Sequence, residues 1–216
     1  MSVIAKHFEE GGWAMYVILF WLIVSIGIIV ERAVYLYRSS MNKDVFLATV
    51  QKAILAGDVA RAIKLCSTAN APLARIVKAG LMKVNRPDAE VQAAMDEAAL
   101  RELPRLEQRT GYLALTANLA MLSGLFGTVL GLIIAFGAVA GADPSSKATM
   151  LAKGISEAMN CTAFGLISAI IALMGFAALN GKTQSLIDDI NAATVQVMNL
   201  VVTNRSKINL QGAAAA

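Results

Sequence analysis

The sequence predicts an all-α membrane protein with three transmembrane helices, and three observations support that fold class. Hydrophobic residues make up 57% of the 216 residues, above the roughly 45–50% of soluble domains. Charged residues make up only 16%. The apolar residues concentrate in three uncharged runs, 11–30, 110–142 and 158–181, each as long as the about 20 residues that cross a bilayer.

The first predicted element is a retained transmembrane helix over residues 11–37, preceded by a periplasmic segment over residues 1–10. Glu9 and Glu10 stand where a signal peptide would carry basic residues. The apolar run also lacks a small-residue cleavage pattern before the charges resume at Glu31.

Residues 38–109 are expected to form a cytoplasmic helical domain, because apolar residues recur at three- and four-residue intervals. Gly57 ends one predicted helix, Asp58 can cap the next, and Pro72 can open another. The segment carries twelve basic and eight acidic residues. This mixed charge, without a basic patch interleaved with aromatic residues, gives no indication of a nucleic-acid partner.

The rest of the chain supplies the other two transmembrane helices. The run 110–142 would be about 50 Å long as a helix, whereas the hydrocarbon core is about 30 Å thick, so a cytoplasmic extension is expected. Residues 143–150 are predicted to be a periplasmic loop and 151–181 the third transmembrane helix. Residues 182–216 are predicted to be a cytoplasmic helical tail, so the second and third helices both extend into a cytoplasmic helical bundle.

Basic residues indicate the orientation. Twelve lie in residues 38–109, against Lys6 before the first run and two lysines between the second and third runs. Because basic residues favour the cytoplasmic side, the N-terminus is predicted to be periplasmic and the C-terminus cytoplasmic.

Glycines at three- and four-residue intervals mark the second run and continue in the third. Gly124, Gly127 and Gly131 follow one another in this way, and Gly165 lies in the third run. Such patterns let membrane helices approach closely, so these four glycines are interpreted as a helix-packing surface.

Glu157 is the strongest functional candidate, because it stands at the start of the third uncharged run. One interpretation is an interfacial carboxylate paired with Lys153 one helical turn away. The other is a functional group, because ionisable residues inside the membrane are costly and mark ion pathways. A carboxyl group removed from water can take up and release protons near neutral pH.

The polar neighbours of Glu157 favour the functional interpretation. Ser156, Asn160 and Cys161 are candidates to line a pathway. Cys161 and the other cysteine, Cys66, lack the spacing of a metal site, and no nucleophile, phosphate-binding or zinc-protease motif appears. The sequence therefore predicts no metal, no cofactor and no enzyme.

Two stretches carry a family resemblance. "LAMLSGLFGTVLGLIIAF" (119–136) and "LAKGISEAMNCTAFGLISAIIALMGFAALN" (151–180) resemble the signature helices of the MotA/TolQ/ExbB proton-channel family, most closely its ExbB/TolQ branch. The resemblance implies a proton pathway through Glu157, Thr128 and Thr162. Two departures stand out: Ile171 replaces a frequent proline, and Asn160 with Cys161 replaces a small apolar pair.

The resemblance also implies an assembly and a location. A homopentamer around a dimer of an ExbD/TolR-like single-span protein is expected, within the lipid of a bacterial inner membrane. The implied function is the proton-channel subunit of a motor that converts proton motive force into mechanical work, in a TonB-, TolA- or gliding-type envelope complex. The alternative is a non-conducting membrane scaffold, and sodium is the alternative ion.

Overall fold

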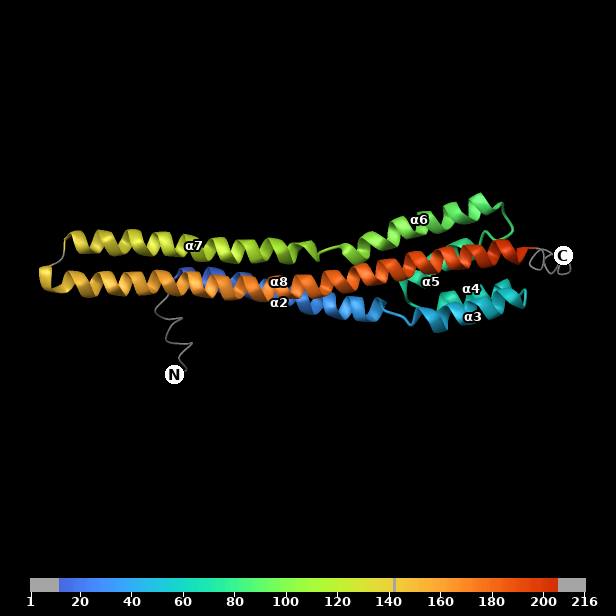
Figure 1. The fold of residues 1–216 in the computed structure, drawn as a ribbon, viewed down its shortest axis with the longest axis horizontal. Helices are drawn as coiled ribbons and strands as arrows, with labels where there is room; N and C mark the ends of the chain where they lie inside the picture. The colour runs from blue at the N-terminus through green and yellow to red at the C-terminus, as the bar shows by residue number, and fades with distance from the viewer. Residues whose placement is uncertain (1–11, 142, 206–216) are drawn as a thin grey trace. The chain divides into compact units, whose positions relative to one another are not determined.

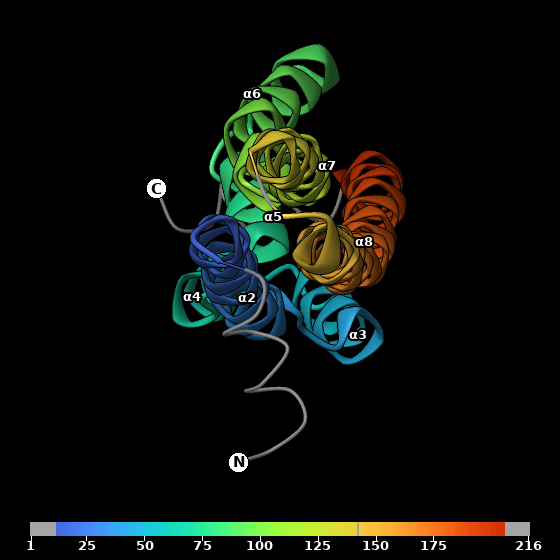
Figure 2. The same cartoon turned by 90° about the vertical axis from the view of Figure 1, so that its left-hand side faces the viewer.

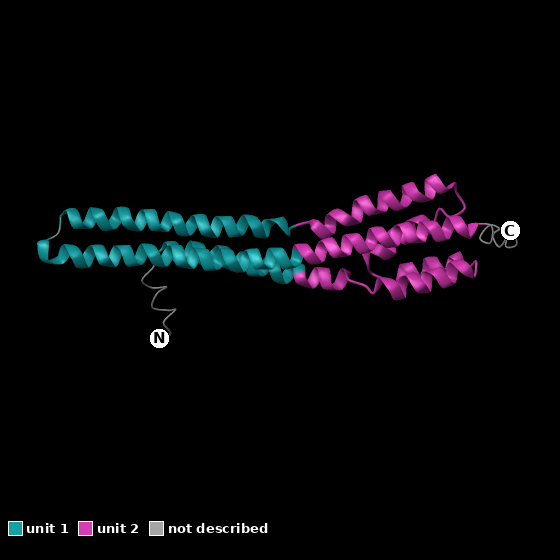
Figure 3. Cartoon of the chain, viewed as in Figure 1, with its two compact units in different colours: residues 1–32, 109–179 teal, residues 33–108, 180–216 magenta. Residues whose placement is uncertain are grey.

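The computed structural model describes residues 12–141 and 143–205, and the regular structure within these ranges is α-helical. The helices fall into two units (Figure 3). Unit 1 contains residues 1–32 and 109–179, and unit 2 contains residues 33–108 and 180–216, each as far as it is described.

Unit 1 consists of three apolar helices that lie side by side (Figures 1 and 2). They are the first part of α2 (Ala14–Ser39), the whole of α7 (Gly111–Ala140) and the first part of α8 (Pro144–Thr203). Three helices in the described chain are long and apolar enough to cross a membrane, judged by length and composition. Their outer faces expose large apolar side chains, among them Phe20, Phe126 and Ile170, as a lipid-facing surface requires.

The connection between α7 and α8 is shorter than predicted. The expected loop over 143–150 is helical from Pro144 onward. Proline suits the first position of a helix, because its missing N–H has no intrahelical partner there. The backbone N–H groups of Ser146 and Lys147 donate to the carbonyl of Asp143 at 3.0 and 3.2 Å, so these polar residues begin the helix instead of forming a loop.

Helix α8 is continuous over 60 residues. The predicted third span, 151–181, and the described part of the predicted tail, 182–216, are therefore one helix. The predicted periplasmic segment 1–10 lies outside the described residues, as does the end of the tail.

Unit 2 contains four short helices whose ends follow the sequence signals. They are α3 (Lys43–Leu55), α4 (Val59–Thr68), α5 (Pro72–Leu81) and α6 (Asp88–Glu107). Gly57 has a left-handed φ of 78° after α3, a conformation that glycine adopts at little cost. The Asp58 carboxylate caps α4 by accepting the backbone N–H of Arg61 at 2.8 Å.

Successive helices of unit 2 pack on one another, with α3 against α4, α4 against α5, and α5 against α6. Their core includes Val50, Ile54, Ile76 and Met95, each 1% exposed or less. Pro104 lies inside α6, which ends at Glu107, three residues beyond it.

Ion pairs attach the end of α8 to the other helices of unit 2. Lys43 on α3 pairs with Asp189 of α8, and Arg205, two residues beyond the end of α8, pairs with Asp88 on α6. The carboxylate of Asp189 raises the pKa of Lys43 by hydrogen bonding and by its charge.

Candidate functional site

The backbones of α7 and α8 touch at two glycines. A Cβ added at Gly165 would lie 3.0 Å from the Cα of Gly124 and 3.0 Å from the carbonyl oxygen of Ala120. A Cβ added at Gly124 would lie 3.0 Å from the carbonyl oxygen of Cys161. Only glycine fits at these two positions without moving a helix, because the neighbouring atoms belong to backbone.

The other two predicted packing glycines extend this contact. A Cβ at Gly131 would lie 3.2 Å from the Cβ of Ala158 on α8. A Cβ at Gly127 would lie 2.9 Å from the Cβ of Ala14 on α2 and 3.1 Å from the Cβ of Cys161 on α8. The three helices of unit 1 therefore meet around Gly127, and small side chains fill the junction.

Thr128 and Thr162 lie together between α7 and α8. Their hydroxyl groups are in direct hydrogen-bond contact. The Thr128 hydroxyl also lies within hydrogen-bond distance of two carbonyl oxygens, that of Gly124 on its own helix at 3.0 Å and that of Ala158 on α8 at 3.2 Å. Both side chains are half-buried. Hydroxyl groups and helix carbonyls thus form a small polar cluster in otherwise apolar surroundings.

Glu157 lies on another side of α8. Its half-buried carboxyl group contacts Gly12, just before the start of α2. Glu157 and Thr162 are five residues apart, so their side chains leave the helix about 140° apart at 3.6 residues per turn. The structure therefore brings the two threonines together without bringing Glu157 to them. Among ion pairs between described residues, none joins Glu157 to Lys153.

The three predicted lining residues differ in their surroundings. Ser156 is exposed, and Asn160 is half-buried. The amide nitrogen of Asn160 is buried and makes no hydrogen bond to the described residues. Cys161 is 2% exposed and packs with Ala14 and Met15 of α2, so it belongs to the helix junction.

Sequence reasoning missed two polar contacts of unit 1. The buried Ser25 of α2 donates a 2.9 Å hydrogen bond to the hydroxyl of Thr116 on α7. Arg109, whose φ is 68°, donates to Glu31 at 2.9 Å. The sequence could have indicated Ser25 as a polar contact, because it is the one serine in the run 11–30. It could not indicate Thr116 as the partner, because that depends on how α2 and α7 are aligned.

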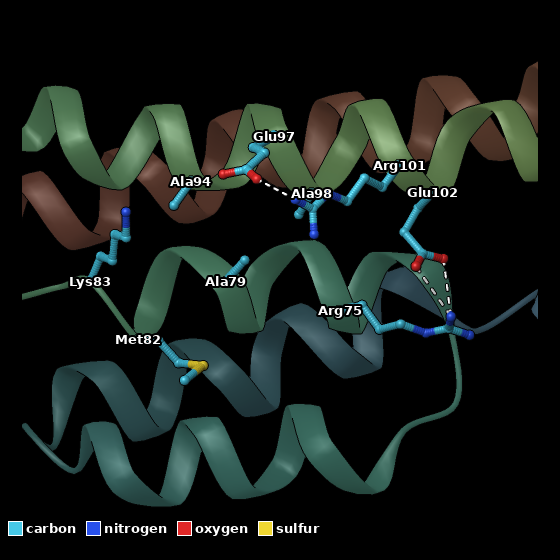
Figure 4. Close-up of a pocket in the computed structure, with 9 residues that line it drawn as sticks. All are labelled: Arg75, Ala79, Met82, Lys83, Ala94, Glu97, Ala98, Arg101 and Glu102. Atoms are coloured by element: carbon cyan, nitrogen blue, oxygen red, sulfur yellow. Dashed lines mark hydrogen bonds and ion pairs between the residues drawn. The ribbon is translucent and has the colours of Figure 1, made fainter.

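Unit 2 has an open groove of about 530 Å³ between α5 and α6 (Figure 4). Four of its five charged groups form ion pairs: Arg75 with Glu102 at 3.2 Å, and Arg101 with Glu97 at 2.5 Å. Elsewhere in this unit, burial raises the pKa of the Cys66 thiol to about 11, which leaves it unreactive at neutral pH. No cluster of three or more metal-ligating side chains occurs in the described chain.

Long apolar helices joined by glycine contacts and carrying a few polar groups define a multi-pass membrane protein. The model of the MotA/TolQ/ExbB proton channel family matches residues 68–192, more than half of the chain. The chain belongs to this family, within its ExbB/TolQ branch. The matched residues include the threonine cluster and Glu157.

Curated relatives agree with this assignment. The chain is 28% identical over 165 residues to a putative biopolymer transport protein, ExbB-like 3, of Synechocystis sp., covering 76% of this chain and 79% of the relative. It is 32% identical over 177 residues to ExbB-like 1 of the same organism, covering 80% and 69%. It is 41% identical over 96 residues to the Tol-Pal system protein TolQ of Haemophilus influenzae, covering 44% of this chain and 42% of the relative.

Proposed function

We propose that this chain is the proton-channel subunit of an inner-membrane motor and that Glu157 carries the proton. One observation carries the proposal: Glu157 is the sole charged residue of α8 between Lys153 and Lys182. A carboxyl group is expensive to keep in an apolar helix and is functional there by default. Membership of the proton-channel family supports the same role.

The threonine cluster supplies a second polar position on the route. Hydroxyl groups both donate and accept hydrogen bonds, so Thr128 and Thr162 can orient water or relay a proton between α7 and α8. Ser156 immediately precedes Glu157, and Asn160 lies three residues after it. In this proposal they line the path beside the carboxyl group.

The proposed assembly is a homopentamer around a dimer of an ExbD/TolR-like single-span partner. The partner transmits work to the periplasm or outer membrane in a TonB-, TolA- or gliding-type complex. The proposed topology has a periplasmic N-terminus and a cytoplasmic C-terminus. Residues 38–109 and the end of α8 form the cytoplasmic bundle, and the short α7–α8 connection is periplasmic. The basic residues of 38–109 support this orientation.

The test is proton flux into vesicles that contain the chain and its partner, under an imposed membrane potential. Glu157→Gln keeps the size of the side chain and removes its titration, so proton flux should fall to the leak of empty vesicles. Glu90→Gln is the matched control, because Glu90 is exposed on α6 of unit 2, and its flux should equal that of the unchanged chain.

The scaffold alternative predicts a different result. If Glu157→Gln assembles with the partner and conducts protons as before, the chain is a scaffold and the channel proposal is wrong. Measuring the total ion current with and without sodium in the medium separates the ions, since a sodium channel loses its current in sodium-free medium and a proton channel keeps it.

A further inference from the structure

The carboxyl group of Glu157 lies against a part of the chain outside residues 68–192, the range that the family model matches. Its carboxyl group lies against Gly12, in the turn that leads into α2. A Cβ added at Gly12 would collide with the Oε1 atom of Glu157 and would lie 3.5 Å from its Cδ atom. The carboxyl group therefore occupies the space that any other residue at position 12 would fill.

The backbone at Gly12 also requires glycine. Its φ is 67°, in the left-handed region that residues with a side chain rarely adopt. This conformation lets the chain turn into α2, where the N–H of Met15 donates to the Gly12 carbonyl at 3.3 Å and that of Tyr16 to the Trp13 carbonyl at 3.1 Å. Space and conformation thus both select glycine at the point of contact.

The start of α2 is a favourable neighbour for a carboxylate. The N–H groups of the first turn of a helix point outward along its axis, and the end carries a partial positive charge of about half an electron. One turn further along α8, Cys161 packs against Ala14, and this contact fixes α8 against the same turn of α2.

We propose that Gly12 is a positioning residue for proton transfer, and that the start of α2 is the surface on which the Glu157 carboxyl group rests between proton uptake and release. The first helix then takes part in the pathway, beyond anchoring the chain. This inference rests on the proposed function of Glu157 as the proton carrier.

The test is a double-mutant cycle measured as proton flux in vesicles with the partner present. Gly12→Ala places a methyl group against the carboxyl group and should lower the flux about tenfold or more, since misplacement by about 1 Å can cost about a hundredfold. Glu157→Asp is one methylene shorter and withdraws the carboxyl group from Gly12. Adding Gly12→Ala to Glu157→Asp should therefore change the flux less than twofold. The difference between this small effect and the effect of Gly12→Ala alone is the coupling between the two residues.

Two control variants separate the contact from other consequences of losing a glycine. Gly57→Ala imposes the same kind of strain, at a φ of 78° in unit 2. Gly137→Ala adds a methyl group in α7 where nothing lies within 4 Å. Both should keep the flux of the unchanged chain.

Labelling of Glu157 by a lipid-soluble carbodiimide gives a measurement that does not depend on flux. The displaced carboxyl group in Gly12→Ala should react at least about threefold faster than in the unchanged chain, as read by mass spectrometry, with Glu157→Gln as the blank. The inference is overturned if Gly12→Ala conducts normally, if its labelling rate is unchanged, or if it lowers flux equally in both backgrounds. If Glu157→Gln conducts protons, the proposed function fails instead.

Discussion

Replacing Gly165 by alanine tests whether the α7–α8 contact determines the stability of unit 1. The added Cβ would lie 3.0 Å from the Cα of Gly124 and from the carbonyl oxygen of Ala120. Both atoms belong to the backbone of α7, so the clash is relieved only by separating the helices. Overpacking of this kind costs about 1–3 kcal/mol.

Gly137→Ala is the matched reference for this measurement. It also adds a methyl group inside a helix of unit 1, but into open space. The gain in helix propensity, about 1 kcal/mol for glycine to alanine, applies to both variants and cancels in the comparison. Unfolding free energies from titration with a denaturing detergent should place Gly165→Ala about 1–3 kcal/mol below Gly137→Ala. Equal stability of the two variants would refute the close backbone contact.

Three further predictions concern polar groups. Thr128→Val removes the hydroxyl that meets Thr162 and two carbonyl oxygens, so proton flux should fall while Thr128→Ser keeps it; equal flux in both variants would contradict a role for the hydroxyl. Ser25→Ala removes an interhelical hydrogen bond and should lower the free energy of unfolding by about 0.6–1.7 kcal/mol, whereas Ser123→Ala, whose bond stays within its own helix, should change it little. Because burial raises the pKa of Cys66 from 9.0 to about 11, the stabilisation from its neutral thiol is complete below pH 9.0 and is lost as the pH rises toward 11. Cys66→Ala should remove that part of the pH dependence of unfolding, and unchanged curves would contradict it.

Features that depend on local sequence were predictable. The ends of α3, α4 and α5 follow from Gly57, Asp58 and Pro72, because each acts through its own backbone or the next turn. The three apolar helices follow from run length alone. The start of α8 was missed because Asp143 and the polar residues after it are equally typical of a loop. A helix start differs from a loop in whether its backbone N–H and carbonyl groups form hydrogen bonds along the chain.

The candidate site depends on which faces of the helices meet, and composition does not decide this. The sequence singles out Glu157, Thr128 and Thr162 by residue type. It leaves open that Thr128 and Thr162 meet between α7 and α8 while Glu157 faces the start of α2. Gly12 could not be recognised as a neighbour of Glu157, since the two are 145 residues apart and nothing in a glycine indicates what fills the space beside it.

The glycine contacts within one chain bear on which surface could join subunits in an oligomer. The sequence predicts that Gly124, Gly127, Gly131 and Gly165 form a helix-packing surface, without saying whether the packing partner is the same chain or another subunit. In the structure, the faces that carry Gly124, Gly131 and Gly165 pack within one chain. A neighbouring subunit would meet large apolar side chains instead, such as Phe126 and Ile133. Substitutions at the glycines should therefore lower the stability of each chain, and the surface that would hold the proposed pentamer together should be sought among the exposed apolar residues.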